Sequence, residues 1–256
     1  MIKNLITAVQ FLTIFTVHRE YQDEERSLAR SIVYFPIVGF LIGFILINAD
    51  KLMMLVALPQ TIANLLLVGL SVLVTRALHI DGLADTMDGL MGGRDPSSRL
   101  AIMRDSRLGT AGAVGIFFVL SVKYLSLNNL FESERVAALL TAPVLARWSQ
   151  TLMLFNAEYG REEGMGKAFV GRLRASGLTA ATAIALGLLA FVAFRMDART
   201  LILILSMLAC VLLLTFLARW YFKRRLGGVT GDAIGAVSEL NEVLVLLLFV
   251  IFSSGN

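Results

Sequence analysis

The sequence predicts an all-α integral membrane protein with about seven transmembrane helices and one further helix at the membrane interface near the N-terminus. Of its 256 residues, 57% are hydrophobic and only 16% are charged, and the mean hydropathy is +0.77. Soluble domains usually contain about 25% charged residues, so this composition lies outside their range. Because the apolar runs are long and repeated, a single leader followed by a soluble domain is excluded. We expect one polytopic membrane domain over residues 1–256.

Seven apolar runs are long enough to span a bilayer, which takes about 20 helical residues. The stretch from Met1 to Val17 lacks the small-residue cleavage site of a leader, and we expect a helix at the membrane interface or a short re-entrant element there. In the first span, Gly39 and Gly43 stand four residues apart and predict close packing against another helix. The predicted spans cover approximately residues 31–49, 61–78, 109–127, 136–155, 176–194, 201–218 and 233–252.

Lysine and arginine residues are distributed unevenly between the connections of these spans. Alternate connections, together with the N-terminal residues, hold 17 of the 23, the opposite connections hold four, and two lie within spans. Because cytoplasmic loops are enriched in these residues, the side with 17 is predicted to face the cytoplasm, and the C-terminus the outside. The net charge of +4 then reflects topology and contact with an anionic lipid bilayer, and it requires no nucleic acid. We expect a multi-pass protein of the cytoplasmic (inner) membrane.

Three aspartates on the cytoplasmic side give the strongest indication of chemistry. The segment H-I-D-G-L-A-D-T-M-D-G, which begins at His79, places Asp81, Asp85 and Asp88 at i, i+4 and i+7. On a helix they fall within roughly 60° of one another. Like charges so placed repel, so we expect a cation, and Mg²⁺ binds one or two carboxylates with water and phosphate. The alternative is a solvated acidic face at a helix N-terminus. His79 either orients a carboxylate or is a hydrogen-bonded interfacial histidine.

The arginines that follow this motif suit a diphosphate substrate. Arg94, Arg104 and Arg107 stand among small residues and beside Asp105. Arginine binds the spread negative charge of phosphate oxygens, and small residues let the backbone approach closely. The alternative for each arginine is a topology residue that pairs with lipid phosphate. As a group next to three aspartates, they favour the substrate role.

A second polar cluster opens the last span. The stretch from Gly227 to Gly231 precedes Asp232, and glycines before such a helix suit an N-cap or a backbone nest for an anion. Glu239 and Glu242 follow within two turns, in an otherwise apolar segment, and acidic residues at membrane depth usually mark a site. For these two glutamates, a substrate site and a structural pairing with Arg147 both remain open.

Four segments follow one another along the chain: Phe35–Gly39, His79–Leu90, Ile102–Gly109 and Gly227–Ala236. Taken in this order, they resemble the adenosylcobinamide-GDP ribazoletransferase family, also called cobalamin 5′-phosphate synthase. Any one of them alone is a weak match, but the combination is specific and spans residues 35–236. The resemblance implies transfer of phosphocobinamide from adenosylcobinamide-GDP to α-ribazole or its 5′-phosphate, with release of GMP and a requirement for Mg²⁺. It implies small-molecule corrinoid and nucleoside substrates and leaves a homo-oligomer open.

The same resemblance suggests roles for the polar residues. Asp81, Asp85 and Asp88 would hold Mg²⁺ against the diphosphate. Asp105 or Asp232 would complete the metal shell or take the proton of the attacking hydroxyl. The expected substrate-binding residues are His79, Arg94, Arg104, Arg107, Gly228, Thr230, Gly231, Glu239 and Glu242.

Two other functional classes remain as alternatives. Another Mg²⁺-dependent phospho-alcohol transferase, of the CDP-alcohol type, would also use spaced aspartates, but its D-G-x-x-A-R opening is absent here. An ion-coupled transporter would use Asp81, Glu239 and Glu242 as coupling groups. Against the transporter, the acidic residues gather at one face of the membrane, and no inverted repeat is visible.

Overall fold

The computed structural model describes residues 2–16, 24–194 and 198–253, and in this part of the chain the regular elements are all helices, with no β-strand. The predicted all-α class is confirmed. The α-helices in the described ranges are α1 (Ile2–Leu12), α2 (Glu24–Ser31), α3 (Phe35–Leu55), α4 (Gln60–Val74), α5 (Leu78–Gly92), α6 (Pro96–Ile102), α7 (Thr110–Asn128), α8 (Glu132–Leu154), α9 (Ala175–Phe194), α10 (Ala198–Leu226) and α11 (Gly231–Ser253). Short 3-10 turns cover Ile32–Tyr34 and Met165–Ala168.

Five helices of the described chain are long and apolar enough to cross a membrane, and the bent pair α4 and α5 would make a sixth. The protein is therefore a multi-pass membrane protein, but the predicted count of seven spans is not confirmed. The expected span over residues 136–155 corresponds to α8, which is long enough at 23 residues but carries buried polar side chains such as Arg147 and Gln150. The N-terminal helix α1 forms as predicted, and its 11 residues are too few to span a bilayer.

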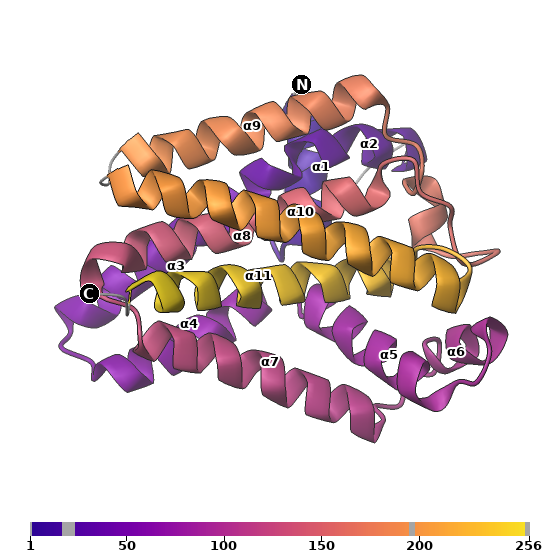
Figure 1. Ribbon diagram of the computed structural model, residues 1–256, viewed down its shortest axis with the longest axis horizontal. Helices are drawn as coiled ribbons and strands as arrows, with labels where there is room; N and C mark the ends of the chain where they lie inside the picture. Colours follow the sequence, from indigo (N-terminus) through magenta and orange to yellow (C-terminus); the bar gives the residue numbers. More distant parts are fainter. Residues whose placement is uncertain (1, 17–23, 195–197, 254–256) are drawn as a thin grey trace.

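Helix α8 lies at the centre of the bundle, packed against α3, α9, α10 and α11 (Figure 1). The core around it contains side chains that are almost completely buried, among them Ile42, Leu145 and Phe249. Because α8 is surrounded by other helices, its polar side chains contact protein rather than lipid, which is where charged groups in a membrane protein are tolerated. This central position explains why α8 is less apolar than the helices around it.

The close packing predicted for the first span is confirmed. Gly39 and Gly43 of α3 lie directly on α8, and a methyl group at either position would overlap the α8 backbone at Pro143 or Leu139. Small residues at a helix crossing let the two backbones approach, which is how helices associate within a membrane. The α3–α8 pair forms the middle layer of the bundle.

A sharp turn between α4 and α5 sets these helices at 86° to each other. Arg76 and Ala77 both have positive φ angles there, 52° and 57°, a region uncommon for residues with a side chain. The Arg76 guanidinium donates to the carbonyls of Thr13 (3.1 Å) and Gln10 (3.2 Å) at the end of α1. Carbonyls at a helix C-terminus lack partners within the helix, so these bonds stabilise the turn. The span expected over residues 61–78 therefore ends earlier than predicted.

The turn directs α5 to one end of the molecule. Figure 1 shows α5 and α6 there, together with the start of α7, the end of α10 and the start of α11. The described C-terminal end of α11 lies at the opposite end of the molecule (Figure 1). The acidic motif and the late glycine cluster, far apart in sequence, therefore meet at the same end of the bundle.

Candidate functional site

Helix α5 presents its three aspartates along one face, as their spacing predicts. Asp81 is exposed, and Asp85 and Asp88 are half-buried. Within the described ranges, the side-chain carboxylates of Asp81 and Asp85 have no hydrogen-bond or ion-pair partner. Two carboxylates one helical turn apart are thus available to a ligand.

Asp88, in contrast, has partners of its own. Its two carboxylate oxygens accept the backbone amides of Gly109 and Gly112, each at 2.8 Å, at the start of α7. A methyl group on either glycine would collide with the Asp88 carboxylate. An anion at a helix N-terminus is favoured by the helix dipole and satisfies amides that lack partners in the helix. Asp88 therefore connects α5 to α7 by hydrogen bonds. The sequence predicted a metal ligand at this position and did not predict this structural contact.

The start of α11 contacts the same helix. Gly82 packs on Asp232, and a methyl group at Gly82 would lie 2.9 Å from the Asp232 Cα. The Asp232 carboxylate interacts electrostatically with Asp81 and Asp85. The structure thus places Asp232 beside the acidic face of α5, although a long stretch of sequence separates the two.

Arg161 is a site residue that the sequence analysis missed. Its Nη2 lies 2.6 Å from Oδ2 of Asp232, and their side chains are only 12% and 22% exposed. The charged, glycine-rich stretch from Gly160 to Lys167 was the available cue, because such a loop either covers a bound substrate or only connects two spans, but it specified no partner for Arg161. Arg104 and Arg161 both interact electrostatically with Tyr159.

The late glycine cluster combines structural contacts with one open position. A methyl group on Gly228 would come 2.6 Å from the carbonyl oxygen of Glu158, so this glycine is needed for backbone packing. The Thr230 hydroxyl accepts the amide of Ala233 at 3.1 Å and caps α11. Gly231 is exposed and has open space where a side chain would stand. Of the three residues expected to bind substrate here, Gly231 is the one whose backbone is open to a ligand.

The remaining expected site residues lie around α6. Arg107 binds Asp105 in a bidentate pair, with Nη2–Oδ2 at 2.6 Å and Nε–Oδ1 at 3.0 Å. These bonds lower the pKa of Asp105 to about 2. Arg94 is exposed, and its carbonyl accepts a hydrogen bond from the buried Arg99. In the described chain, neither Arg94 nor Arg107 forms a hydrogen bond or ion pair with Asp81, Asp85 or Asp88.

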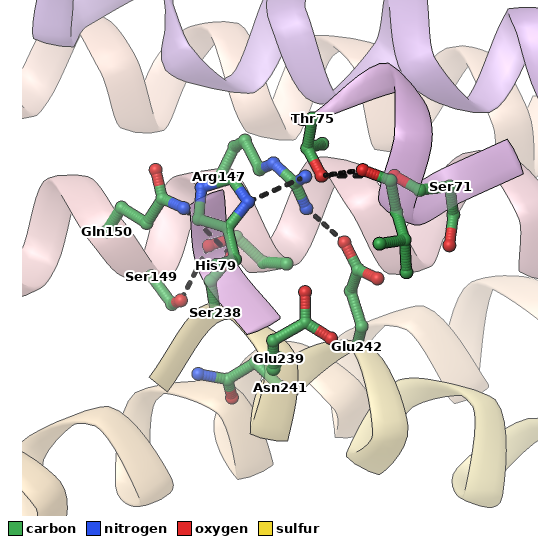
Figure 2. Close-up of polar contacts among 12 residues, drawn as sticks. Ser71, Thr75, His79, Arg147, Ser149, Gln150, Ser238, Glu239, Asn241 and Glu242 are labelled. Atoms are coloured by element: carbon green, nitrogen blue, oxygen red, sulfur yellow. Dashed lines mark hydrogen bonds and ion pairs between the residues drawn. The ribbon is translucent and has the colours of Figure 1, made fainter. Parts of the chain in front are cut away.

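A cluster of charged side chains lies inside the bundle, next to the first turn of α5 (Figure 2). Lys123 of α7 donates to Glu239 and to Glu242, each at 2.6 Å. Glu242 also pairs with Arg147, whose Nη2 lies 3.4 Å from Nδ1 of His79. Two cations balance two acids, which is the condition under which buried charges are tolerated. Glu242 therefore shows the structural pairing with Arg147 that the sequence left open, with Lys123 as an additional partner. Glu239 pairs with Lys123 instead, and His79 is buried beside Arg147.

The donor set at the acidic face fits a magnesium ion. Within the residues that the structure describes, no group of three or more histidine, cysteine, aspartate or glutamate side chains converges to form a metal cage. Asp81 and Asp85 have free carboxylates, whereas the oxygens of Asp88 are bound to α7 and Asp232 is paired with Arg161. Mg²⁺ usually takes one or two carboxylates and completes its shell with water and substrate phosphate, whereas structural zinc takes four protein ligands.

The fold and site together define a polytopic helical membrane protein with an acidic, arginine-containing site at one end, an arrangement suited to a phosphorylated substrate. The chain belongs to the cobalamin-5-phosphate synthase family, whose model matches residues 4–250. The resemblance seen in four sequence segments is thereby confirmed.

Relatives from several bacteria match almost the full chain. Proteins named adenosylcobinamide-GDP ribazoletransferase are 40% identical in Geotalea daltonii, with 98% of both chains covered, and 36% identical in Thermoanaerobacter pseudethanolicus, with 97% of both covered. One from Klebsiella pneumoniae is 38% identical, with 96% of this chain and 99% of the relative covered. No solved structure matches the chain.

Proposed function

We propose that this protein transfers the phosphocobinamide part of adenosylcobinamide-GDP to α-ribazole or its 5′-phosphate and releases GMP, with Mg²⁺ bound at the acidic face. The observation that carries the proposal is that the free carboxylates of Asp81 and Asp85 stand beside Asp232 and Arg161. Two free carboxylates that could hold Mg²⁺ and an arginine suit a diphosphate substrate, and a further carboxylate could accept the proton of an attacking hydroxyl. The family and the names of the relatives support the same reaction.

In this reaction, the hydroxyl oxygen of the riboside forms a bond to the phosphorus that carries cobinamide. The bond from that phosphorus to the bridging oxygen breaks, and GMP leaves. Asp81 and Asp85 would hold Mg²⁺, which neutralises charge on the diphosphate when bound. Arg104 and Arg161 would bind phosphate oxygens.

Asp232 is the proposed acceptor of the hydroxyl proton. The sequence left Asp105 and Asp232 as alternatives for this role. Because the hydrogen bonds from Arg107 hold the pKa of Asp105 at about 2, its carboxylate is a poor base near neutral pH. Asp232 also lies beside Asp81 and Asp85, where the reacting groups would meet.

The two alternative classes fit the molecule less well. An ion-coupled transporter would use Glu239 and Glu242 as free coupling groups, but both are paired with cations inside the bundle. A phospho-alcohol transferase of the CDP-alcohol type would belong to a different family from the one that matches this chain.

Purified protein incubated with adenosylcobinamide-GDP, α-ribazole and Mg²⁺ is expected to yield equal amounts of GMP and a joined corrinoid product, measured by chromatography. A reaction without α-ribazole controls for hydrolysis, which would release GMP with no joined product. A chelator should stop the reaction and added Mg²⁺ should restore it. Absence of the joined product under all these conditions would overturn the proposed function.

We also propose that the acidic site faces the cytoplasm. A reporter inserted near Gly164 is expected on the cytoplasmic side, and one fused after Asn256 on the outer side, because of the charge asymmetry between the loops. The helices α9, α10 and α11 lie between these points, and each is long and apolar enough to span. Reporter enzymes active on one side of the membrane only would measure this. If both report the same side, the topology is wrong.

A further inference from the structure

A short stretch of paired backbone brings Arg161 to the start of α11. The amide of Val229 donates to the carbonyl of Glu158 at 2.9 Å, and the amide of Gly160 donates to the carbonyl of Val229 at 3.0 Å. Gly160 and Gly228 lie against each other at this pairing, with no room for a methyl group on Gly228. Because the backbone directly before Arg161 is held in place, its side chain starts from a defined point beside α11.

Arg161 uses only part of its hydrogen-bonding capacity in this position. Its Nη2 pairs with Asp232 and lies 3.4 Å from the carbonyl of Met103. Its Nε is buried and has no hydrogen-bond partner in the part of the chain that the structure describes. A guanidinium has five N–H donors in a planar fork that matches two phosphate oxygens. An unused, buried donor beside an acidic face therefore points to an acceptor supplied by a ligand.

A cation bound at the acidic face would compete with Arg161 for the carboxylate of Asp232. Asp232 interacts electrostatically with Asp81 and Asp85, and Asp85 also interacts with Arg161. In the free protein, the Arg161 guanidinium offsets the repulsion between these acids. A divalent cation at Asp81 and Asp85 would stabilise Asp232 in the same way and would repel the guanidinium. Binding of a cation at Asp81 and Asp85 is therefore disfavoured by the Arg161 guanidinium unless Arg161 has another anion to bind.

We infer that Arg161 exchanges partners, pairing with Asp232 in the free protein and with a diphosphate oxygen of the substrate when it binds. The exchange frees the Asp232 carboxylate at the moment the diphosphate arrives. This inference rests on the proposed function and deepens it, because it makes the proposed base available only when substrate is present. Arg161 is then a substrate-binding residue that also controls a neighbouring acid.

Binding of Mn²⁺ to the purified full-length protein, without substrate, tests the competition directly. Electron paramagnetic resonance measures the free Mn²⁺. The Arg161→Gln variant is expected to bind Mn²⁺ roughly tenfold more tightly than the wild type, because one cation a few ångströms from the site is removed. Lys167→Gln is the matched control. It removes one exposed cation from the same loop, where the ammonium contacts only the carbonyl of Glu162 among the described residues, and should leave Mn²⁺ affinity unchanged. Equal or weaker binding by Arg161→Gln overturns the inference.

A second experiment measures the affinity of the protein for inorganic diphosphate by equilibrium dialysis, with a chelator present to remove metal ions. The Asp232→Asn variant leaves Arg161 without its carboxylate and is expected to bind diphosphate several-fold more tightly than the wild type. Arg161→Gln should bind it more weakly. The Asp232→Asn variant tests the partner exchange even if Arg161→Gln fails to fold. If Asp232→Asn binds diphosphate no more tightly than the wild type does, the exchange is overturned.

The two proposals can fail separately. If Mn²⁺ and diphosphate binding change as expected but no corrinoid product forms, the partner exchange stands and the proposed function fails. If the wild type makes the product but the variants bind both probes as the wild type does, only the exchange is wrong.

Discussion

Replacing Asp81 or Asp85 by asparagine is expected to abolish transfer while the protein remains folded and inserted in the membrane. Both carboxylates lack a protein partner within the described ranges, so neither substitution breaks a contact that holds the fold. Each removes one negative charge from the face proposed to hold Mg²⁺, and a metal ion supplies several kcal/mol of transition-state stabilisation. The rate should fall by on the order of a thousandfold or more. GMP release gives the rate, and thermal unfolding in detergent reports folding.

Two further variants distinguish loss of a proposed metal ligand from loss of another acidic residue nearby. Glu163→Gln removes an exposed acid from a nearby loop and should leave both rate and stability unchanged. Asp88→Asn, unlike the Asp81, Asp85 and Glu163 variants, should lower stability. The amide nitrogen of asparagine cannot accept the hydrogen bond that Gly109 or Gly112 donates to the carboxylate. We expect this substitution to lower the melting temperature by loosening α7 from α5. Near-normal turnover in both Asp81→Asn and Asp85→Asn would contradict the assignment of the metal face.

Replacing Glu242 by glutamine is expected to destabilise the protein by about 3–5 kcal/mol, the usual effect of removing one member of a buried ion pair. Glu242 is the acid that both Lys123 and Arg147 contact, and all three are almost completely buried. With one carboxylate left, two buried cations would face a single acid. Denaturant unfolding in detergent measures the free energy of unfolding.

A neutral double substitution provides the control for this effect. Lys123→Met combined with Glu239→Gln removes one positive and one negative charge and leaves the pair of Arg147 with Glu242 intact. Because no charge is left uncompensated, the loss of stability should be clearly smaller than for Glu242→Gln alone. Equal losses would show that packing, and not charge balance, governs the cluster.

Several features of the fold and site could be predicted from the sequence because they depend on local order along the chain. Long apolar runs predict helices in a membrane, since every backbone group there must find a partner within its own segment. The spacing of Asp81, Asp85 and Asp88 predicts a shared helix face, because backbone geometry alone sets that angle. Gly39 and Gly43 predict a close helix crossing by the same logic, and the structure shows that crossing on α8.

Other features depend on which elements meet, and no local spacing encodes that. The turn at Arg76 and Ala77 contains neither glycine nor proline, so it was not anticipated. It is stabilised by carbonyl groups of α1, far away in sequence. Similarly, the sequence of α8 predicts another span, but only the structure shows that its polar residues face protein at the centre of the bundle.

By itself, the sequence determined that this is a helical membrane protein, that three aspartates share one helix face, and that the chain resembles its family. Only the tertiary structure decided which charges become partners. Asp88 binds α7, Arg161 pairs with Asp232, and Lys123 joins the buried glutamates. The physical reason is that periodicity within a helix follows from its own backbone, whereas the partner of a charged side chain depends on how separate helices cross. That crossing is set by the packing of the whole bundle.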